Sequence, residues 1–188
     1  MASTTDSMGK LQEMPPASAI ALQMEAKHYF DAVRALLDVF APRKHLHSIY
    51  VTATIPSKSI ISALEVLDVD LKRTHFVDCV SSMMMGFSEK DEGTVYVESP
   101  TMLENILLKV EFLIRKLDGA DSVVIIDSIN SLAIHNSLKI VSEFLHILIN
   151  HLRSRNAYTV IFAMEEYTTE EVENILSLVC DETVNFTG

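Results

Sequence analysis

The chain has 188 residues, of which 48% are hydrophobic and 22% charged, a balance typical of a globular protein with a sizeable core. Its formal net charge of −11 disfavours general nucleic-acid binding, because an acidic surface is repelled by phosphate backbones. Only 5 glycines and 5 prolines are present, fewer than an all-β fold usually needs for its turns.

The sequence also argues against a membrane or secreted setting. Cys79 and Cys180 lie in or beside apolar segments, as the reduced thiols of a cytosolic protein do. No apolar run reaches the roughly 18 residues that a membrane helix needs, and the N-terminus lacks the apolar core of a signal peptide. The histidines lack the spacing of a zinc site. We therefore expect a cytoplasmic protein without a metal site.

The first 16 residues differ in character from the rest of the chain. They are small and polar, carry no periodicity and end in Pro15 and Pro16. Residues 1–16 are therefore predicted to form a flexible tail, and residues 17–188 a single α/β domain.

From Ala17 onward, short β-like runs alternate with helical patterns. Apolar and β-branched runs predict strands over residues 18–22, 47–54, 74–80, 94–97, 122–127, 157–163 and 182–186. Helical spacing and capping signals predict helices over 29–40, from Ser57 onward, from Ser99-Pro100 to Leu117, over 138–152, and from a capping box at 168–171 to Val179. Pro42 is expected to end the first helix, and residues 81–93 to form a loop. This alternation predicts an α/β three-layer sandwich with a mostly parallel sheet.

One strand carries a recognisable motif. The segment VVIIDSINSL, residues 123–132, is an apolar strand that ends in Asp127 and continues with Ser128. Together with the order of segments from IYVTATIPSKSIISAL (49–64) to TVIFAMEEYT (159–168), it resembles the RecA/KaiC-like ATPase superfamily over about residues 18–186. The resemblance implies that residues 123–132 are similar to a Walker B segment, whose aspartate orients the phosphate-bound magnesium.

The phosphate-binding motif of that superfamily is degenerate here. A P-loop reads G-x-x-x-x-G-K-[ST], and the best-placed stretch is ALQMEAKH, residues 21–28, with Lys27 at the lysine position. Ala21 and Ala26 replace both glycines, which restricts the backbone near a phosphate. His28 replaces the hydroxyl that binds magnesium. Lys27 is equally compatible with an ordinary exposed helix residue.

A water-activating group is also missing. KaiC-like ATPases usually carry acidic residues just after the second strand, whereas residues 52–55 (TATI) have none. We therefore expect a pseudo-ATPase similar to archaeal-type KaiC-like proteins. It would be a non-catalytic regulatory or interaction protein that acts without a cofactor, through a homo-oligomer or a protein partner. The resemblance to those proteins implies a role in signalling.

Two other functions remain open. In the alternative, the chain is a nucleotide-binding protein or weak ATPase that binds ATP and magnesium through Lys27, Asp127 and Ser128. A third possibility is an enzyme with unrelated chemistry at the same sheet edge.

Several further side chains follow predicted strands or cover predicted helices. Asp78 is interpreted as a cap of a loop or of the next helix, and Glu165 and Glu166 as an acidic pair that is either functional or solvated. Residues 83–85 are three methionines that form either an adaptable contact surface or a disordered loop. The wide apolar arc of residues 138–152 predicts cover by a neighbouring helix or another subunit.

Overall fold

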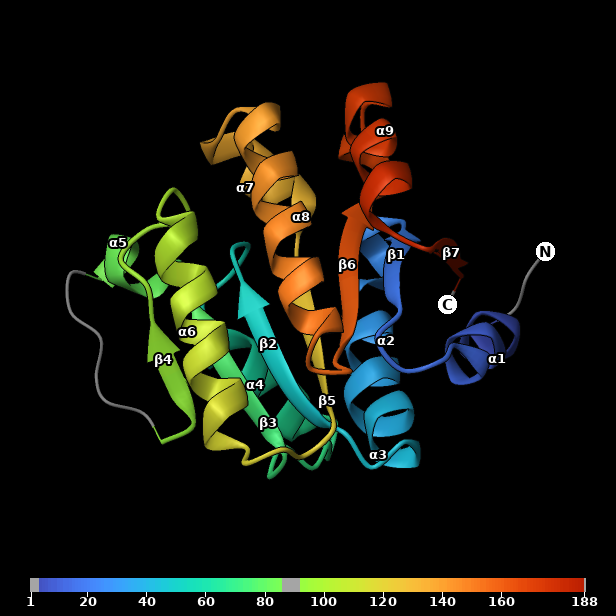
Figure 1. Cartoon of the computed structure of the whole chain (residues 1–188). Coiled ribbons are helices and arrows are strands. Elements are labelled where there is room, and N and C mark those ends of the chain that lie inside the picture. Colours follow the sequence, from blue (N-terminus) through green and yellow to red (C-terminus); the bar gives the residue numbers. More distant parts are fainter. Residues whose placement is uncertain (1–3, 86–91, 188) are drawn as a thin grey trace.

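The computed structural model describes residues 4–85 and 92–187, and it alternates strands with helices (Figure 1). The strands are β1 (Ala19–Met24), β2 (His47–Thr52), β3 (Thr74–Asp78), β4 (Thr94–Tyr96), β5 (Ser122–Asp127), β6 (Tyr158–Met164) and β7 (Glu182–Phe186). The α-helices are α1 (Thr4–Glu13), α2 (Tyr29–Arg34), α3 (Ala41–Arg43), α4 (Ser57–Val66), α5 (Ser81–Met85), α6 (Leu103–Lys116), α7 (Ile129–His135), α8 (Leu138–Arg153) and α9 (Glu170–Val179). Two 3-10 turns, η1 (Ala26–His28) and η3 (Glu165–Tyr167), and a π-helical stretch, η2 (Ala35–Phe40), join them.

Within the described ranges the strands form one seven-stranded sheet in the order β4-β3-β2-β5-β6-β1-β7. Every neighbouring pair is parallel. The apolar strand β5 lies at the centre, with Thr52 of β2 opposite Asp127 and Ile161 of β6 opposite Ile126. The predicted α/β fold with a parallel sheet is therefore confirmed, and the carboxyl ends of β2, β5 and β6 meet at one edge.

The side chains of each strand point alternately to two helical layers. Val124 and Ile126 of β5 pack in a core with α6, α8 and α9, which lie in front of the sheet in Figure 1. Val123 and Ile125 pack in a second core with α2 and α4 behind it. Because both faces are covered, β5 reads in the sequence as a continuous apolar run.

The wide apolar arc of α8 is explained mainly by its position between two helices. α8 packs on the sheet and contacts both α6 and α9. Phe144 and Ile149 are buried in the core that these helices share with the sheet, as the arc predicted. Ile140 and Ile147 remain 51% and 57% exposed. Cover by a second subunit is therefore not required for most of this helix.

Part of the segment predicted to be a flexible tail, residues 1–16, is helical in the structure. Residues 4–13 form α1, which packs beside the outer strand β7 (Figure 1). Met8 and Leu11 are buried, and the Ser7 hydroxyl donates a hydrogen bond to the Asn185 carbonyl at 2.7 Å. Two apolar side chains three residues apart among small polar residues are too weak a pattern to predict such a helix.

The predicted loop over residues 81–93 is wrong in its first part, because residues 81–85 form α5. The carboxylate of Asp78 accepts hydrogen bonds from the backbone amides of Val80 and Ser81 at 2.9 and 2.8 Å. These bonds satisfy amides at the start of the helix and allow it to begin directly after the strand. Residues 86–91 of the predicted loop lie outside the described residues.

Two other helix boundaries differ from the prediction. The helical path continues through Pro42 to Arg43, because Pro42 lies in the first turn of α3, where a missing amide hydrogen costs little. The helix predicted to start at Ser99-Pro100 begins at Leu103. The Ser99 hydroxyl instead accepts a hydrogen bond from the Thr101 amide at 3.2 Å and so forms a local turn.

In the part of the chain that the structure describes, no helix combines the length and apolar character needed to span a bilayer.

Candidate functional site

Two switch points lie at the carboxyl edge of the sheet, where neighbouring strands continue to opposite faces. β1 leads to α2 behind the sheet, whereas its neighbour β6 leads to α9 in front (Figure 1). β2 leads to α4 behind, whereas its neighbour β5 leads to α7 in front. Parallel α/β proteins bind ligands at such points. The predicted site residues lie at these two positions, here named the β6/β1 and the β2/β5 switch points.

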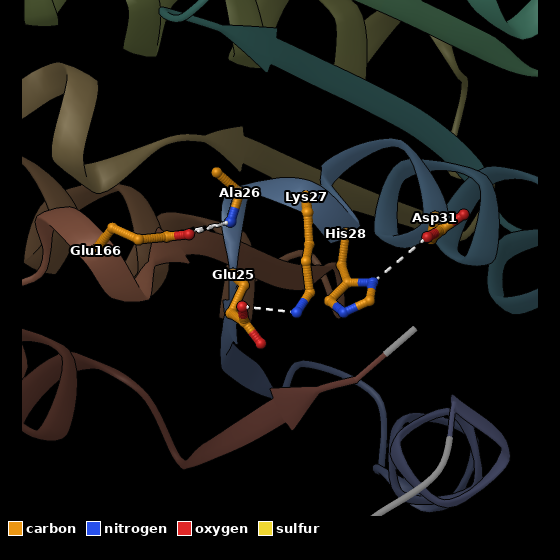
Figure 2. A network of polar contacts seen from close by, with 6 residues as sticks. All are labelled: Glu25, Ala26, Lys27, His28, Asp31 and Glu166. Carbon is orange, nitrogen blue, oxygen red and sulfur yellow. Dashed lines mark hydrogen bonds and ion pairs between the residues drawn. The ribbon is translucent and has the colours of Figure 1, made fainter.

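At the β6/β1 switch point the chain passes almost directly from strand to helix. Residues 21–24, which match the start of the P-loop pattern, belong to β1, and Glu25 alone separates the strand from η1. The amide of Ala26 donates hydrogen bonds to both carboxylate oxygens of Glu166, at 2.9 and 3.1 Å (Figure 2). The first free amide of a helical stretch is a place where proteins bind anions. Here the exposed carboxylate of Glu166 occupies it.

Lys27 lies in a surface network beside this contact. Its ammonium group is 2.8 Å from the Glu25 carboxylate (Figure 2), and both side chains are largely exposed. The hydrogen bond between them raises the pKa of Lys27 and lowers the pKa of Glu25. The next residue, His28, has its Nδ1 atom 3.5 Å from the Asp31 carboxylate. Lys27 thus has an acidic partner of its own two residues away.

At the β2/β5 switch point, the carboxylate of Asp127 is fully buried and surrounded by hydroxyl groups. Its Oδ2 atom accepts hydrogen bonds from Tyr29 at 2.5 Å and from Tyr50 at 2.8 Å. Its Oδ1 atom accepts one from Thr54 at 2.8 Å. A carboxylate offers about four acceptor positions, so most of its capacity is used inside the protein.

Burial dominates the electrostatics of this network. Burial raises the pKa of Asp127, and the hydrogen bonds from Tyr29, Tyr50 and Thr54 oppose that rise. Burial and the nearby Asp127 charge also raise the pKa values of Tyr29 and Tyr50. The tyrosines therefore stay protonated at neutral pH and remain donors to the carboxylate.

Ser128, next to Asp127, has a structural role. It is buried, and its hydroxyl accepts the amide hydrogen of Ser131 at 3.2 Å, which makes it the N-cap of α7. The hydroxyl of Ser131 also lies 2.9 Å from that of Thr54. The contacts of the described residues therefore place Lys27 in one network and Asp127 with Ser128 in another.

Sequence reasoning missed most of the partners in these networks. Tyr29 and Tyr50 were expected only as helix-face and strand residues, yet a buried tyrosine hydroxyl needs a polar partner, and two such residues signal a buried acceptor. Glu166 was expected to be solvated or part of an acidic pair; it is exposed, and it also accepts the hydrogen bond from Ala26, which was not expected. No local sequence signal predicts that last contact, since it spans 140 positions.

Asp78 acts as the cap that its position predicted. Its carboxylate accepts hydrogen bonds from the Ser57 amide and the Ser81 hydroxyl, both at 2.7 Å, besides the amides that start α5. Burial alone would raise the pKa of Asp78, but the hydrogen bonds from Ser81 and Ser57 outweigh it and hold the pKa below its ordinary value.

Comparison with known proteins supports the fold. The model of a family of unknown function, DUF7504, matches residues 25–186. No curated protein is similar enough in sequence to count as a match. A KaiC-like protein, PH0186, from Pyrococcus horikoshii OT3 has a similar structure, with a TM-score of 0.62 at 14% identity over 92% of this chain and 73% of that one. The flagellar accessory protein FlaH from Methanocaldococcus jannaschii has a TM-score of 0.65 at 14% identity over 96% and 76%.

At this level of identity the similarities show the fold alone. They agree with the RecA/KaiC-like α/β architecture that the order of segments predicted.

Proposed function

The chain belongs to the family of unknown function DUF7504, and we propose that it is a non-catalytic protein with a RecA/KaiC-like fold. In this proposal it regulates or organises other proteins, in signalling or assembly, through contacts between its own copies or with a protein partner.

The observation that carries the proposal is the surroundings of Asp127. In phosphoryl-transfer ATPases the corresponding aspartate helps to hold the magnesium ion. Here Tyr29, Tyr50 and Thr54 donate to both of its oxygens, and the group is fully buried. Magnesium demands oxygen ligands in nearly ideal octahedral geometry. A metal would have to displace these hydroxyls, so the network supports a structural role for Asp127.

The charges at the β6/β1 switch point support the same conclusion. A nucleotide brings a chain of negative phosphates, which needs free amides and positive charge. The amide of Ala26 is already bonded to Glu166, and Glu25 pairs with Lys27 (Figure 2). Glu165 precedes Glu166 on the same exposed turn. These carboxylates would repel a polyanion that approached η1.

A role through contacts is supported by exposed apolar side chains. Met83 and Met84 of α5 are exposed near the carboxyl edge of the sheet, and methionine adapts to differently shaped partners. Ile140 and Ile147 are exposed on α8. One structural neighbour is described as an accessory protein. Such a role fits a chain with this fold in which the polar groups at the two switch points are bonded to one another.

A sensitive assay of magnesium-dependent ATP hydrolysis tests the proposal. We expect no turnover above a buffer control, since removing even one transition-state interaction typically lowers the rate by about 10²–10³. Lys27→Ala is the informative variant, and Lys139→Ala, at another exposed lysine, is its matched control. Turnover that is lost in Lys27→Ala but kept in Lys139→Ala would overturn the proposal in favour of a weak ATPase.

A further inference from the structure

A groove of about 500 Å³ opens at the carboxyl edge of the sheet, between α7 and the start of α9. Its walls are mostly apolar, with Ala133, Ile134 and Leu138 on one side and Val172 on the other. Thr54 and Ser131 form a polar floor at the β2/β5 switch point. Ligand sites in proteins have this size and this combination of apolar walls with a few convergent polar groups. We call it the α7/α9 groove.

The hydroxyl hydrogens of the floor all point in one direction. The Thr54 hydroxyl has one hydrogen and donates it to Asp127 at 2.8 Å. The Ser131 hydroxyl must therefore be the donor in its 2.9 Å contact with Thr54. Ser128 must then be the donor in its 3.2 Å contact with Ser131. The chain of donors therefore runs from Ser128 through Ser131 and Thr54 to Asp127. The oxygens of Ser131 and Thr54 have only lone pairs left to offer the groove.

The charges around the floor favour the same kind of ligand. Among the described residues that line the groove, none carries a charge. Behind the floor, Asp127 lies within hydrogen-bonding distance of Thr54. An anion or another hydrogen-bond acceptor at this floor would be repelled by the oxygen lone pairs, because no hydrogen would lie between the two acceptors. A ligand that brought N–H or O–H hydrogens would complete the chain of hydrogen bonds.

The groove is held in shape by a clamp at its back. The Oδ1 atom of Asn130 accepts the Met164 amide hydrogen at 2.8 Å, and its Nδ2 atom donates to Thr168 at 3.1 Å. The Thr168 hydroxyl donates in turn to the Met164 carbonyl at 2.6 Å. These bonds tie α7 to the end of β6. A preformed site loses less free energy on binding than one that must first be ordered.

We propose that the α7/α9 groove binds a small molecule with an apolar body about the size of an aromatic ring and a head group that donates hydrogen bonds to Ser131 and Thr54. The exposed side chains of Ile134 and Tyr167 at the rim would cover the apolar body. Such a site would give the proposed regulatory protein a chemical signal to respond to.

Three probes that share one body and differ in the head group test this proposal. We would titrate the ¹⁵N-labelled full chain with benzamide, N,N-dimethylbenzamide and benzoate, and follow the amide resonances. Benzamide should shift resonances of residues 128–138 and 164–172, with a dissociation constant in about the millimolar range expected of a fragment. The other two probes lack the donor head, so their affinity should be lower than that of benzamide by at least about fivefold.

Two variants and a control locate the site. Ser131→Ala should weaken benzamide binding about fivefold and leave N,N-dimethylbenzamide binding unchanged, because only benzamide uses the lost acceptor. Ala133→Trp should abolish binding of all three probes by filling the groove. Leu108→Ala changes an exposed leucine of α6 outside the groove and should alter nothing.

Equal binding of the three probes, shifts confined to other residues, an unchanged affinity in Ser131→Ala, or no shift up to the solubility limit would each overturn the proposal. These outcomes are separate from a failure of the proposed function. Nucleotide binding would be reported by residues 25–28 at the β6/β1 switch point, whereas the groove is reported by α7 and α9.

Discussion

Glu166 places its carboxylate on the backbone amide of Ala26, and this bidentate contact joins the ends of β6 and β1 across the switch point between them (Figure 2). The contact connects residues 140 positions apart. It places a carboxylate of the chain itself at the start of η1, where the phosphate loop of an ATPase would lie.

Removal of this carboxylate should loosen the start of η1. In Glu166→Ala, hydrogen exchange of the Ala26 amide should accelerate about fivefold, equivalent to about 1 kcal/mol for one lost hydrogen bond. Glu165→Ala removes the neighbouring carboxylate and serves as the matched control. An unchanged exchange rate in Glu166→Ala would show that the contact does not persist in solution.

Replacement of Asp127 should lower stability. In Asp127→Asn the amide nitrogen cannot accept hydrogen bonds from Tyr29 and Tyr50, so we expect a loss of about 1–3 kcal/mol in the free energy of unfolding by urea. Asp118→Asn, at an exposed aspartate with positive φ that asparagine also tolerates, should have little effect. If Asp127→Asn is as stable as the wild type, the hydroxyl network is not structural.

Two stacked histidines should make stability depend on pH. The rings of His47 and His75 lie 6.1 Å apart, and among the described residues neither buried Nδ1 atom has a hydrogen-bond partner. Burial lowers the pKa of both, with further contributions from Arg73 for His47 and from His47 and Lys116 for His75. As the pH falls below about 6.5, these histidines therefore become protonated in the unfolded chain at a higher pH than in the folded chain.

Stability should thus be greatest above about pH 6.5 and decline as the pH falls through the window between the unfolded and folded pKa values of these histidines. Urea unfolding at pH 7.5 and 5.5 measures the decline, and His75→Gln should reduce it. The raised pKa of Asp127 acts with the opposite sign in acid, so the comparison with His75→Gln isolates the histidine contribution. An identical decline in both proteins would contradict this assignment.

The N-terminal helix should contribute to global stability. Leu11 is fully buried against the core behind the sheet, and Leu11→Ala should cost about 2–4 kcal/mol in urea unfolding. Lys10→Ala, at the preceding exposed residue, should be nearly neutral. Equal stability of the two variants would mean that α1 is detached in solution, as the sequence prediction of a flexible tail supposed.

The features of the fold that depend on a local sequence pattern could be predicted. The continuous apolar run of residues 122–127 predicted the central strand with Asp127 at its carboxyl end, and the alternation of strands and helices predicted the parallel sheet. The partners of Asp127 were not predictable in the same way. Tyr29 and Tyr50 lie 98 and 77 positions from it and reach it only through the order of strands and the helix behind them.

We propose that the two switch points, as the described residues form them, do not bind a nucleotide, and calorimetric titration with magnesium-ATP tests this proposal. Because Glu166 occupies the Ala26 amide and hydroxyl groups surround Asp127, we expect no binding heat beyond dilution. Stoichiometric binding that disappears in Lys27→Ala and persists in Lys139→Ala would contradict it.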